Sequence, residues 1–368
     1  MARNLLGWAM TPPRQDDAAL IAAGRPLPRH PEPKIRSASM SISSAIAGTP
    51  HPAIETGLTD VFERCRTHTQ GKVATYIPEL ATMPPEQFGL ALATIDGKLS
   101  TRGDADSEFT IQSVSKAFSY CLALELLGRD EVLRHVGVEP SGDAFNAIIF
   151  DPRTERPFNP MVNAGAITIC ALIQRELKHD ALEFVLDRFS KAAGRQLRIS
   201  DPVYRSECLT GHRNRAIGHL LLTVGAAQEP IEPALDLYFK QCSILVNATD
   251  LARMGATLAN IGQNPFTQES VFDVAAVRDT LSVMFTCGMY DYSGNWAVDV
   301  GIPAKSGVGG GVVGVVNRQI GIGTFSPRLD DKGNSVRGLK AFQELADEFG
   351  LHAFECTNYG SEFMRSLA

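Results

Sequence analysis

The chain has 368 residues, of which 44% are hydrophobic and 21% are charged, as in globular proteins with one large domain or two smaller ones. Its formal net charge of -6, without a basic patch interleaved with aromatic residues, argues against nucleic acids and anionic membranes as partners. The 7 cysteines stand singly and the 8 histidines lack metal-ligand spacing, so we expect reduced thiols and no metal site.

Residues 1–50 are rich in proline, arginine and alanine, and no apolar run among them is long enough for a signal peptide or a membrane span. We therefore expect a flexible tail and a cytoplasmic protein. Met40 is an alternative start of the chain.

Helical and strand signals then alternate up to the first candidate site residue. Residues 54–66 have the periodicity of a helix with one apolar side. Residues 88–104 contain two short apolar runs around Asp96-Gly97, a dipeptide typical of a tight β-hairpin turn. A helix is expected to begin near Ser113 and to end at Gly128.

The middle of the chain is expected to be helical and free of strands. The expected helices are 164–177, 181–194, 215–225, 234–242, 250–262 and 273–287. Strands are expected to return within 295–307 and 310–326, before a last helix at 336–349.

This order of elements predicts an α+β fold in which one mixed antiparallel sheet is assembled from both ends of the chain. Terminal helices would flank the sheet, and an all-helical subdomain would lie beside it. The expected organisation is a tail at 1–50 and a single domain at 51–368, with a sheet subdomain near 51–112 and 289–368 and a helical subdomain near 113–288.

The stretch FTIQSVSKAFSY, residues 109–120, places Ser113 and Lys116 three positions apart at the start of a helix. Residues with this spacing share a helix face, so the hydroxyl and the amine could interact. A desolvated lysine can lose its proton and act as the base that a serine nucleophile needs. The alternative is coincidence, because about one or two Ser-x-x-Lys spacings are expected by chance in a chain of this length.

The tripeptide Lys305-Ser306-Gly307, on an expected strand, favours chemistry over coincidence. The chain is similar here to penicillin-binding proteins and class A β-lactamases, in which a Ser-x-x-Lys helix faces a strand with Lys-Thr-Gly. The alternative is a glycine-rich strand end or a weak phosphate loop, although KSGVGGG lacks the spacing of a Walker loop.

Nine segments closely resemble the serine-dependent glutaminase family, in the expected order over about residues 55–350. They are YIPEL (76–80), IQSVSK (111–116), FN (145–146), NPMVNAGAI (159–167), SECLTGHRN (206–214), YFKQCSI (238–244), GMYDYSG (288–294), PAKSGVGGG (303–311) and GNSVRG (333–338). The resemblance implies a β-lactamase-like fold and hydrolysis of the L-glutamine side-chain amide to L-glutamate and ammonia, without a cofactor.

The same resemblance implies roles for individual residues. Ser113 would be the nucleophile, Lys116 its activating base, and Tyr290 a proton relay to the departing ammonia. The substrate pocket would consist of Tyr76, Gln112, Ser113, Asn163, Glu207, Asn214, Tyr238, Tyr290 and the backbone of Val308.

The residue types suit free glutamine. Glu207 suits the α-ammonium, whereas Asn163, Asn214 and the tyrosines suit the α-carboxylate. The alternative interpretation makes Glu207 and Asn214 solvated helix residues, Tyr238 a packed ring and Asn163 only a helix cap.

Three other functions remain open at this point. A β-lactamase or penicillin-binding-type enzyme would normally need export, and a nucleotide-binding module would need a Walker loop. A non-catalytic glutamine-binding protein would be expected to lack Ser113 or Lys116, and both are present. The family resemblance further implies a homodimer or homotetramer.

Overall fold

The computed structural model describes residues 51–355. The expected tail and the alternative start at Met40 lie outside the described residues. Between residues 51 and 355 no helix is both long and apolar enough to cross a membrane.

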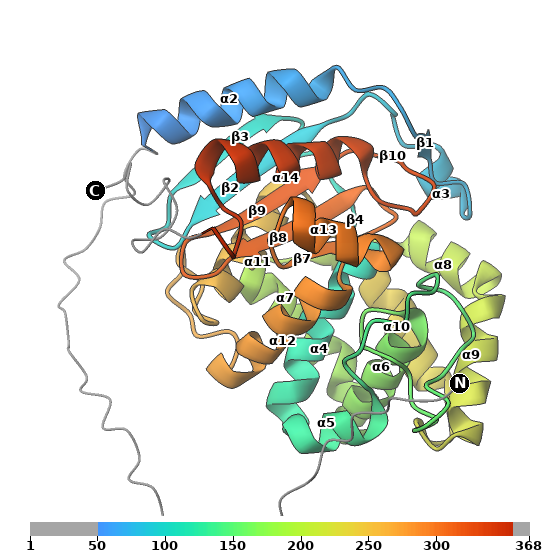
Figure 1. Ribbon diagram of the computed structural model, residues 1–368. Coiled ribbons are helices and arrows are strands. Elements are labelled where there is room, and N and C mark those ends of the chain that lie inside the picture. Colours follow the sequence, from blue (N-terminus) through green and yellow to red (C-terminus); the bar gives the residue numbers. More distant parts are fainter. Residues whose placement is uncertain (1–50, 356–368) are drawn as a thin grey trace, which may run out of the picture. The chain divides into compact units, whose positions relative to one another are not determined.

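A five-stranded antiparallel sheet of order β3-β2-β9-β8-β7 occupies one part of the structure (Figure 1). Its strands are β2 (Gly89–Thr94), β3 (Leu99–Gly103), β7 (Ala304–Ser306), β8 (Gly311–Val316) and β9 (Ile320–Phe325). The hairpin expected around Asp96-Gly97 is confirmed as β2 and β3. Pairing of Leu90 in β2 with Thr324 in β9 confirms that both ends of the chain contribute to one sheet.

Helices cover both faces of this sheet, because its strands alternate between two buried sets of side chains. In β2, Leu90 and Leu92 pack in the cluster that contains side chains of α2 (Pro52–Arg66) and α14 (Val336–Phe349). Ala91 and Ala93 pack in the other cluster, on the face covered by α11 (Ala248–Ala259). Figure 1 shows α2 and α14, blue and red, lying together over the outer face.

Glycines in β9 let the backbone of α11 lie directly against the backbone of the sheet. A Cβ atom on Gly321 would lie 2.0 Å from Ala256 N and 2.2 Å from Ala252 O. A Cβ on Gly323 would lie 2.1 Å from Ala248 O. The small residues of β9 therefore determine how closely the helical layer lies against the sheet.

The remaining helices gather below the sheet in the view of Figure 1. They are α4 (Ser115–Leu127), α5 (Arg129–His135), α6 (Asn163–Leu177), α7 (Ala181–Ala193), α8 (Asp201–Thr210), α9 (His212–Thr223), α10 (Glu232–Cys242) and α12 (Val274–Cys287). The helices expected from periodicity are confirmed, whereas α5 and α8 were not anticipated.

Two sequence expectations are wrong. The middle of the chain was expected to lack strands, but β5 (Arg198–Ile199) and β6 (Ile244–Val246) form a small sheet with β4 (Phe109–Thr110). Strands this short carry no periodic signal. Residues 295–299, expected to begin a strand, belong to helix α13 (Ser293–Asp299), in which Val298 is exposed.

Short elements complete the described chain. They are the paired strands β1 (Lys72–Val73) and β10 (Arg328–Leu329), helix α3 (Pro78–Ala81), and the 3₁₀ turns η1 (Gln112–Val114), η2 (Lys178–Asp180) and η3 (Tyr290–Tyr292).

Candidate active site

Ser113 lies in the 3₁₀ turn η1, directly before α4, and is 6% exposed. The preceding residue, Gln112, has a φ of +48°, a conformation that non-glycine residues rarely adopt. Ser115 Oγ donates a hydrogen bond to Gln112 O at 2.7 Å and helps to hold this turn. Strained backbone of this kind concentrates at functional positions because surrounding contacts must maintain it.

Lys116 lies in the first turn of α4 and is 1% exposed. Its Nζ donates hydrogen bonds to Asn163 Oδ1 at 2.6 Å and to Met161 O at 3.4 Å. Both acceptors are uncharged, and burial lowers the pKa of Lys116 to about 8. An amine with this pKa is neutral in a useful fraction of molecules near neutral pH, as a general base must be.

Tyr290 begins η3, is buried, and has a φ of +57°. Its hydroxyl faces the Ser113 hydroxyl and the Val308 amide, yet it completes no hydrogen bond of normal geometry with any residue between 51 and 355. Burial raises the pKa of Tyr290, so the phenol keeps its proton at neutral pH. A buried, protonated and unpaired hydroxyl next to Ser113 is able to pass a proton to or from a reacting group.

A pocket of about 360 Å³ opens over Ser113. Eight of the predicted pocket residues line it together: Tyr76, Gln112, Ser113, Asn163, Glu207, Asn214, Tyr238 and Val308. Tyr290 lines a neighbouring cavity of about 180 Å³, and Phe145 lines both. The structure therefore brings all the predicted substrate-binding residues to one place.

Glu207 is the one carboxylate that the described residues contribute to the pocket lining, and it is 6% exposed. Burial raises its pKa, while hydrogen bonds from Tyr76 and Gln112 act in the opposite direction. The Tyr76 hydroxyl lies 2.7 Å from Glu207 Oε1 and 2.8 Å from Gln112 Oε1. Although Tyr76 is 47% exposed overall, its hydroxyl thus points inward and orients the carboxylate.

Two asparagines connect the base to the opposite wall. Asn163 Nδ2 donates to Asn214 Oδ1 at 2.9 Å, while Asn163 Oδ1 accepts from Lys116. Asn163 is the first residue of α6, whose N-cap is Val162, so the alternative interpretation of Asn163 as only a helix cap is wrong. Its amide instead lies between Lys116 and the pocket.

Glycines bring the segment after β7 close to the serine turn. A Cβ on Gly307 would lie 2.9 Å from Ile111 O, and one on Gly309 would lie 2.5 Å from Thr110 O. Gly310 has a φ of +94°. Val308 is thereby held against the serine turn, where its amide nitrogen faces the Tyr290 hydroxyl.

The site also contains residues that sequence reasoning did not assign to it. Phe145 and Asn146 line the pocket, and their dipeptide was noted only as part of the resemblance. Lys305 is fully buried, and its Nζ lies 4.2 Å from the centre of the Tyr290 ring. Its Lys-Ser-Gly motif was the available signal, but spacing along the chain does not show which side chain a lysine contacts.

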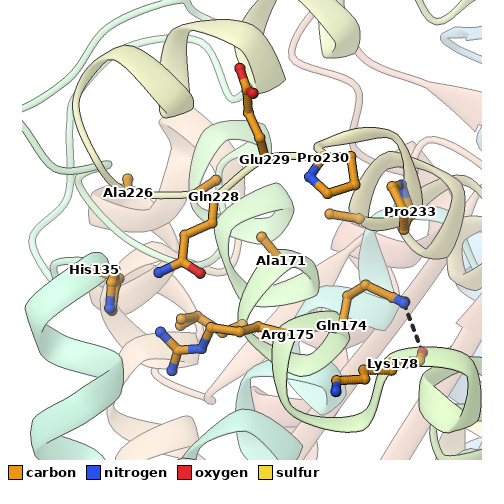
Figure 2. Close-up of a pocket in the computed structure, with 13 residues that line it drawn as sticks. His135, Ala171, Gln174, Arg175, Lys178, Ala226, Gln228, Glu229, Pro230 and Pro233 are labelled. Carbon is orange, nitrogen blue, oxygen red and sulfur yellow. Dashed lines mark hydrogen bonds between the residues drawn. The ribbon is translucent and has the colours of Figure 1, made fainter.

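A separate cavity of about 330 Å³ lies between α6 and the segment that joins α9 to α10. Figure 2 shows Arg175, His135 and Gln228 gathered at one side of it. Arg175 donates to Glu131 Oε1 at 2.7 Å, so its charge is compensated. Within the part of the chain that the structure describes, no serine or cysteine and none of the predicted site residues lines this cavity, and we therefore place the chemistry in the pocket over Ser113.

Comparison with known proteins shows the family of the chain. A sequence profile described as Glutaminase matches residues 71–354. The chain is 50% identical over 312 residues to a glutaminase of Nostoc sp., covering 85% of this chain and 93% of that one. It is 45% identical over 312 residues to a glutaminase of Corynebacterium glutamicum, covering 84% and 75%.

Solved structures agree with the sequence relatives. A structure of the probable glutaminase ybaS superposes with a TM-score of 0.81 at 38% identity, covering 83% of this chain and 99% of that one. The native form of Mglu superposes with a TM-score of 0.79 at 41% identity, covering 84% and 75%. The chain belongs to the glutaminase family.

Proposed function

We propose that the protein hydrolyses the side-chain amide of L-glutamine to L-glutamate and ammonia through an ester on Ser113. One observation carries this proposal: Ser113 lines the pocket, and Lys116, a buried lysine to which the described residues give no carboxylate partner, follows in the next helical turn. A serine needs such a base to become a nucleophile.

In the first step, Ser113 Oγ attacks the carboxamide carbon while Lys116 Nζ takes the hydroxyl proton. The negative oxygen that forms is held by the backbone N–H groups of Ser113 and Val308. The carbon–nitrogen bond then breaks, and a proton delivered through the Tyr290 hydroxyl makes ammonia the leaving group. The product of this step is a γ-glutamyl ester of Ser113.

In the second step, water replaces the serine oxygen. Lys116 takes a proton from the water as its oxygen attacks the ester carbon, either directly or through the Tyr290 hydroxyl, which gives its own proton to Lys116 as it accepts one, and a proton returns to Ser113 Oγ as the ester bond breaks. L-Glutamate leaves, and the free serine is restored.

Recognition rests on the two charged groups that the α-carbon of free glutamine carries. Glu207, the carboxylate of the pocket lining, pairs with the α-ammonium. The amides of Asn163 and Asn214 and the hydroxyl of Tyr238 supply neutral donors to the α-carboxylate. Gln112 and Tyr76 orient Glu207.

The proposal also covers the wider protein. Residues 51–368 form one catalytic domain that works in the cytoplasm as a homodimer or homotetramer. Six cysteines without disulfides within the described range support a reducing compartment. Light scattering after size-exclusion chromatography would measure the assembly state.

Hydroxylamine tests the covalent intermediate, because it competes with water for an ester. Wild-type protein given L-glutamine and hydroxylamine should form γ-glutamyl hydroxamate in addition to glutamate, and the Ser113→Ala variant should form neither. Ammonia release with no hydroxamate at any hydroxylamine concentration would argue against the ester. L-Asparagine in parallel measures the preference for glutamine.

A further inference from the structure

Two ionic side chains occur among the described residues that line the pocket over Ser113, and they have opposite charge. They are Glu207 and Arg213. Free glutamine carries an ammonium and a carboxylate on its α-carbon. The proposed recognition pairs Glu207 with the ammonium but gives the carboxylate only neutral donors. Arg213 is therefore the candidate for the second counter-charge.

A tight joint between α8 and α9 places both charges along the same pocket. Glu207 lies in the second half of α8, and Arg213 lies in the first turn of α9. One residue, Gly211, joins these helices, and a Cβ on it would lie 2.5 Å from Glu207 O and 2.6 Å from Phe239 Cζ. A larger residue would have to displace backbone atoms, so the arrangement of the two charges depends on this glycine.

The guanidinium of Arg213 is available to a ligand. Arg213 is exposed, and its side chain forms no hydrogen bond or ion pair with any other residue between 51 and 355. In contrast, Arg215 lies 5.4 Å from the centre of the Phe239 ring and does not line the pocket. The planar guanidinium of an arginine can donate two parallel hydrogen bonds to one carboxylate.

The neutral donors of the pocket leave this contact open. Asn163 accepts from Lys116 through Oδ1 and donates one Nδ2 hydrogen to Asn214. The donors that remain, on the two asparagine amides and on Tyr238, carry no net charge. The first turn of α9, with Arg213 and Asn214, faces the pocket, so the positive end of the helix dipole adds to the effect of the guanidinium.

We propose that Arg213 is a specificity-determining residue that binds the α-carboxylate of the substrate, beside the contact of Glu207 with the α-ammonium. This inference rests on the proposed function and deepens it. The pocket then selects amino acids in which both α-groups are charged, and it discriminates against glutamine whose α-carboxylate is blocked, as in the interior of a peptide. Arg213 takes no part in the chemical steps at Ser113.

Substrates that differ only at the α-carbon test this contact. L-Glutamine α-amide lacks the carboxylate charge, and its product, L-isoglutamine, can be separated by chromatography. In Arg213→Gln, KM for L-glutamine should rise about tenfold, as for loss of one partly exposed charged hydrogen bond. The turnover number kcat should change by less than about twofold, because the contact is equally strong in the transition state. For the α-amide, KM should be the same in the variant and the wild type.

A third substrate and two further variants serve as controls. Glutaramate keeps the carboxylate and lacks the ammonium, so Arg213→Gln should impair its turnover as strongly as that of glutamine. Arg205→Gln removes one positive charge from an exposed residue of α8 that does not line the pocket, and it should change neither kcat nor KM. Arg213→Lys keeps the charge but not the paired donors, so its KM for glutamine should be intermediate. An equal rise of KM on glutamine and on the α-amide, or no rise on glutamine, would overturn the proposal.

Calorimetry tests the same contact without turnover. L-Glutamate carries the α-groups of glutamine, and L-isoglutamine has an amide in place of the α-carboxylate. Arg213→Gln should weaken the binding of L-glutamate about tenfold and leave the binding of L-isoglutamine unchanged. Equal affinity of the variant and the wild type for L-glutamate would refute the inference. Wild-type protein that shows this binding difference but no glutamine turnover would refute the proposed function alone.

Discussion

At the residue scale, the proposed chemistry depends on Lys116, whose two hydrogen-bond acceptors are uncharged. Ser113 and Lys116 could be recognised from their spacing, because a three-residue separation on a helix is a local property. Their surroundings could not be predicted in this way. Asn163 is distant from Lys116 in the sequence, yet its amide oxygen lies 2.6 Å from Nζ, and only the packing of α6 against α4 produces this contact.

Replacing the Asn163 amide by a carboxylate should shift the pH dependence of kcat/KM. In Asn163→Asp, a negative charge next to Lys116 stabilises the ammonium and raises its pKa. Since Lys116 acts as a base when it is neutral, kcat/KM increases with pH as Lys116 loses its proton. This acidic limb of the pH profile should move up by about one to three pH units from its wild-type position. Asn214→Asp places the new charge beyond Asn163 and should shift the limb less. Equal shifts in the two variants would argue against direct contact between Asn163 and the base.

Glu207 should control recognition of the α-ammonium. Glu207→Gln keeps the shape of the side chain and a partner for Tyr76 but removes the charge. We expect kcat/KM for L-glutamine to fall about 30- to 1,000-fold, as for loss of one buried charge partner. Glutaramate, which is glutamine without its amino group, should be turned over equally by the variant and the wild type. An equal loss on both substrates would contradict the contact.

At the element scale, the long periodic helices and the hairpin followed from the sequence, and the shortest elements did not. β5 and β6 have two and three residues, too few for an alternating pattern to appear. In α13, the pattern of Val298 and Val300 resembles a strand, although Val298 is exposed and Val300 is buried at the helix end. Tertiary contacts, rather than local preference, determine these segments.

The contact between α11 and β9 should tolerate no added methyl group. Gly321→Ala places a Cβ against backbone atoms of α11, which cannot turn away as a flexible side chain would. We expect a loss of about 1–3 kcal/mol in the free energy of unfolding, measured in urea. Gly294→Ala in α13 meets nothing within 4 Å and should be neutral or slightly stabilising. Equal stabilities would show that α11 is free to shift.

At the scale of the whole molecule, the site exists because distant parts of the chain meet. Ser113 follows the first hairpin, Glu207 and Asn214 lie in the middle helices, Lys305 lies in β7, and Val308 comes shortly after that strand. The order of helical and strand signals indicated a sheet assembled from both ends, and the family resemblance indicated the pocket. Neither of these two signals showed that Lys305 Nζ lies against the face of the Tyr290 ring, because that contact depends on the tight packing of β7 against Gly288.

Arg337 should be important for holding the two ends of the chain together. Its side chain is 2% exposed and donates to His68 O at 2.7 Å, Glu86 O at 3.0 Å and Glu86 Oε2 at 3.0 Å. Arg337→Met leaves these acceptors unpaired and should lower the free energy of unfolding by about 2–4 kcal/mol. Arg64, whose side chain is 45% exposed, also connects the two ends through Glu344, and Arg64→Met should cost less than about 1 kcal/mol. The opposite order of the two losses would contradict this assignment.

The most direct test of the central claim is ammonia release from L-glutamine by the wild type and by Ser113→Ala, with glutamine binding to the variant measured by calorimetry. Wild-type protein should release ammonia, and the variant should bind glutamine but release ammonia at a rate lower by about 10⁴-fold or more. Ammonia release by Ser113→Ala at the wild-type rate would contradict a mechanism in which Ser113 is the nucleophile.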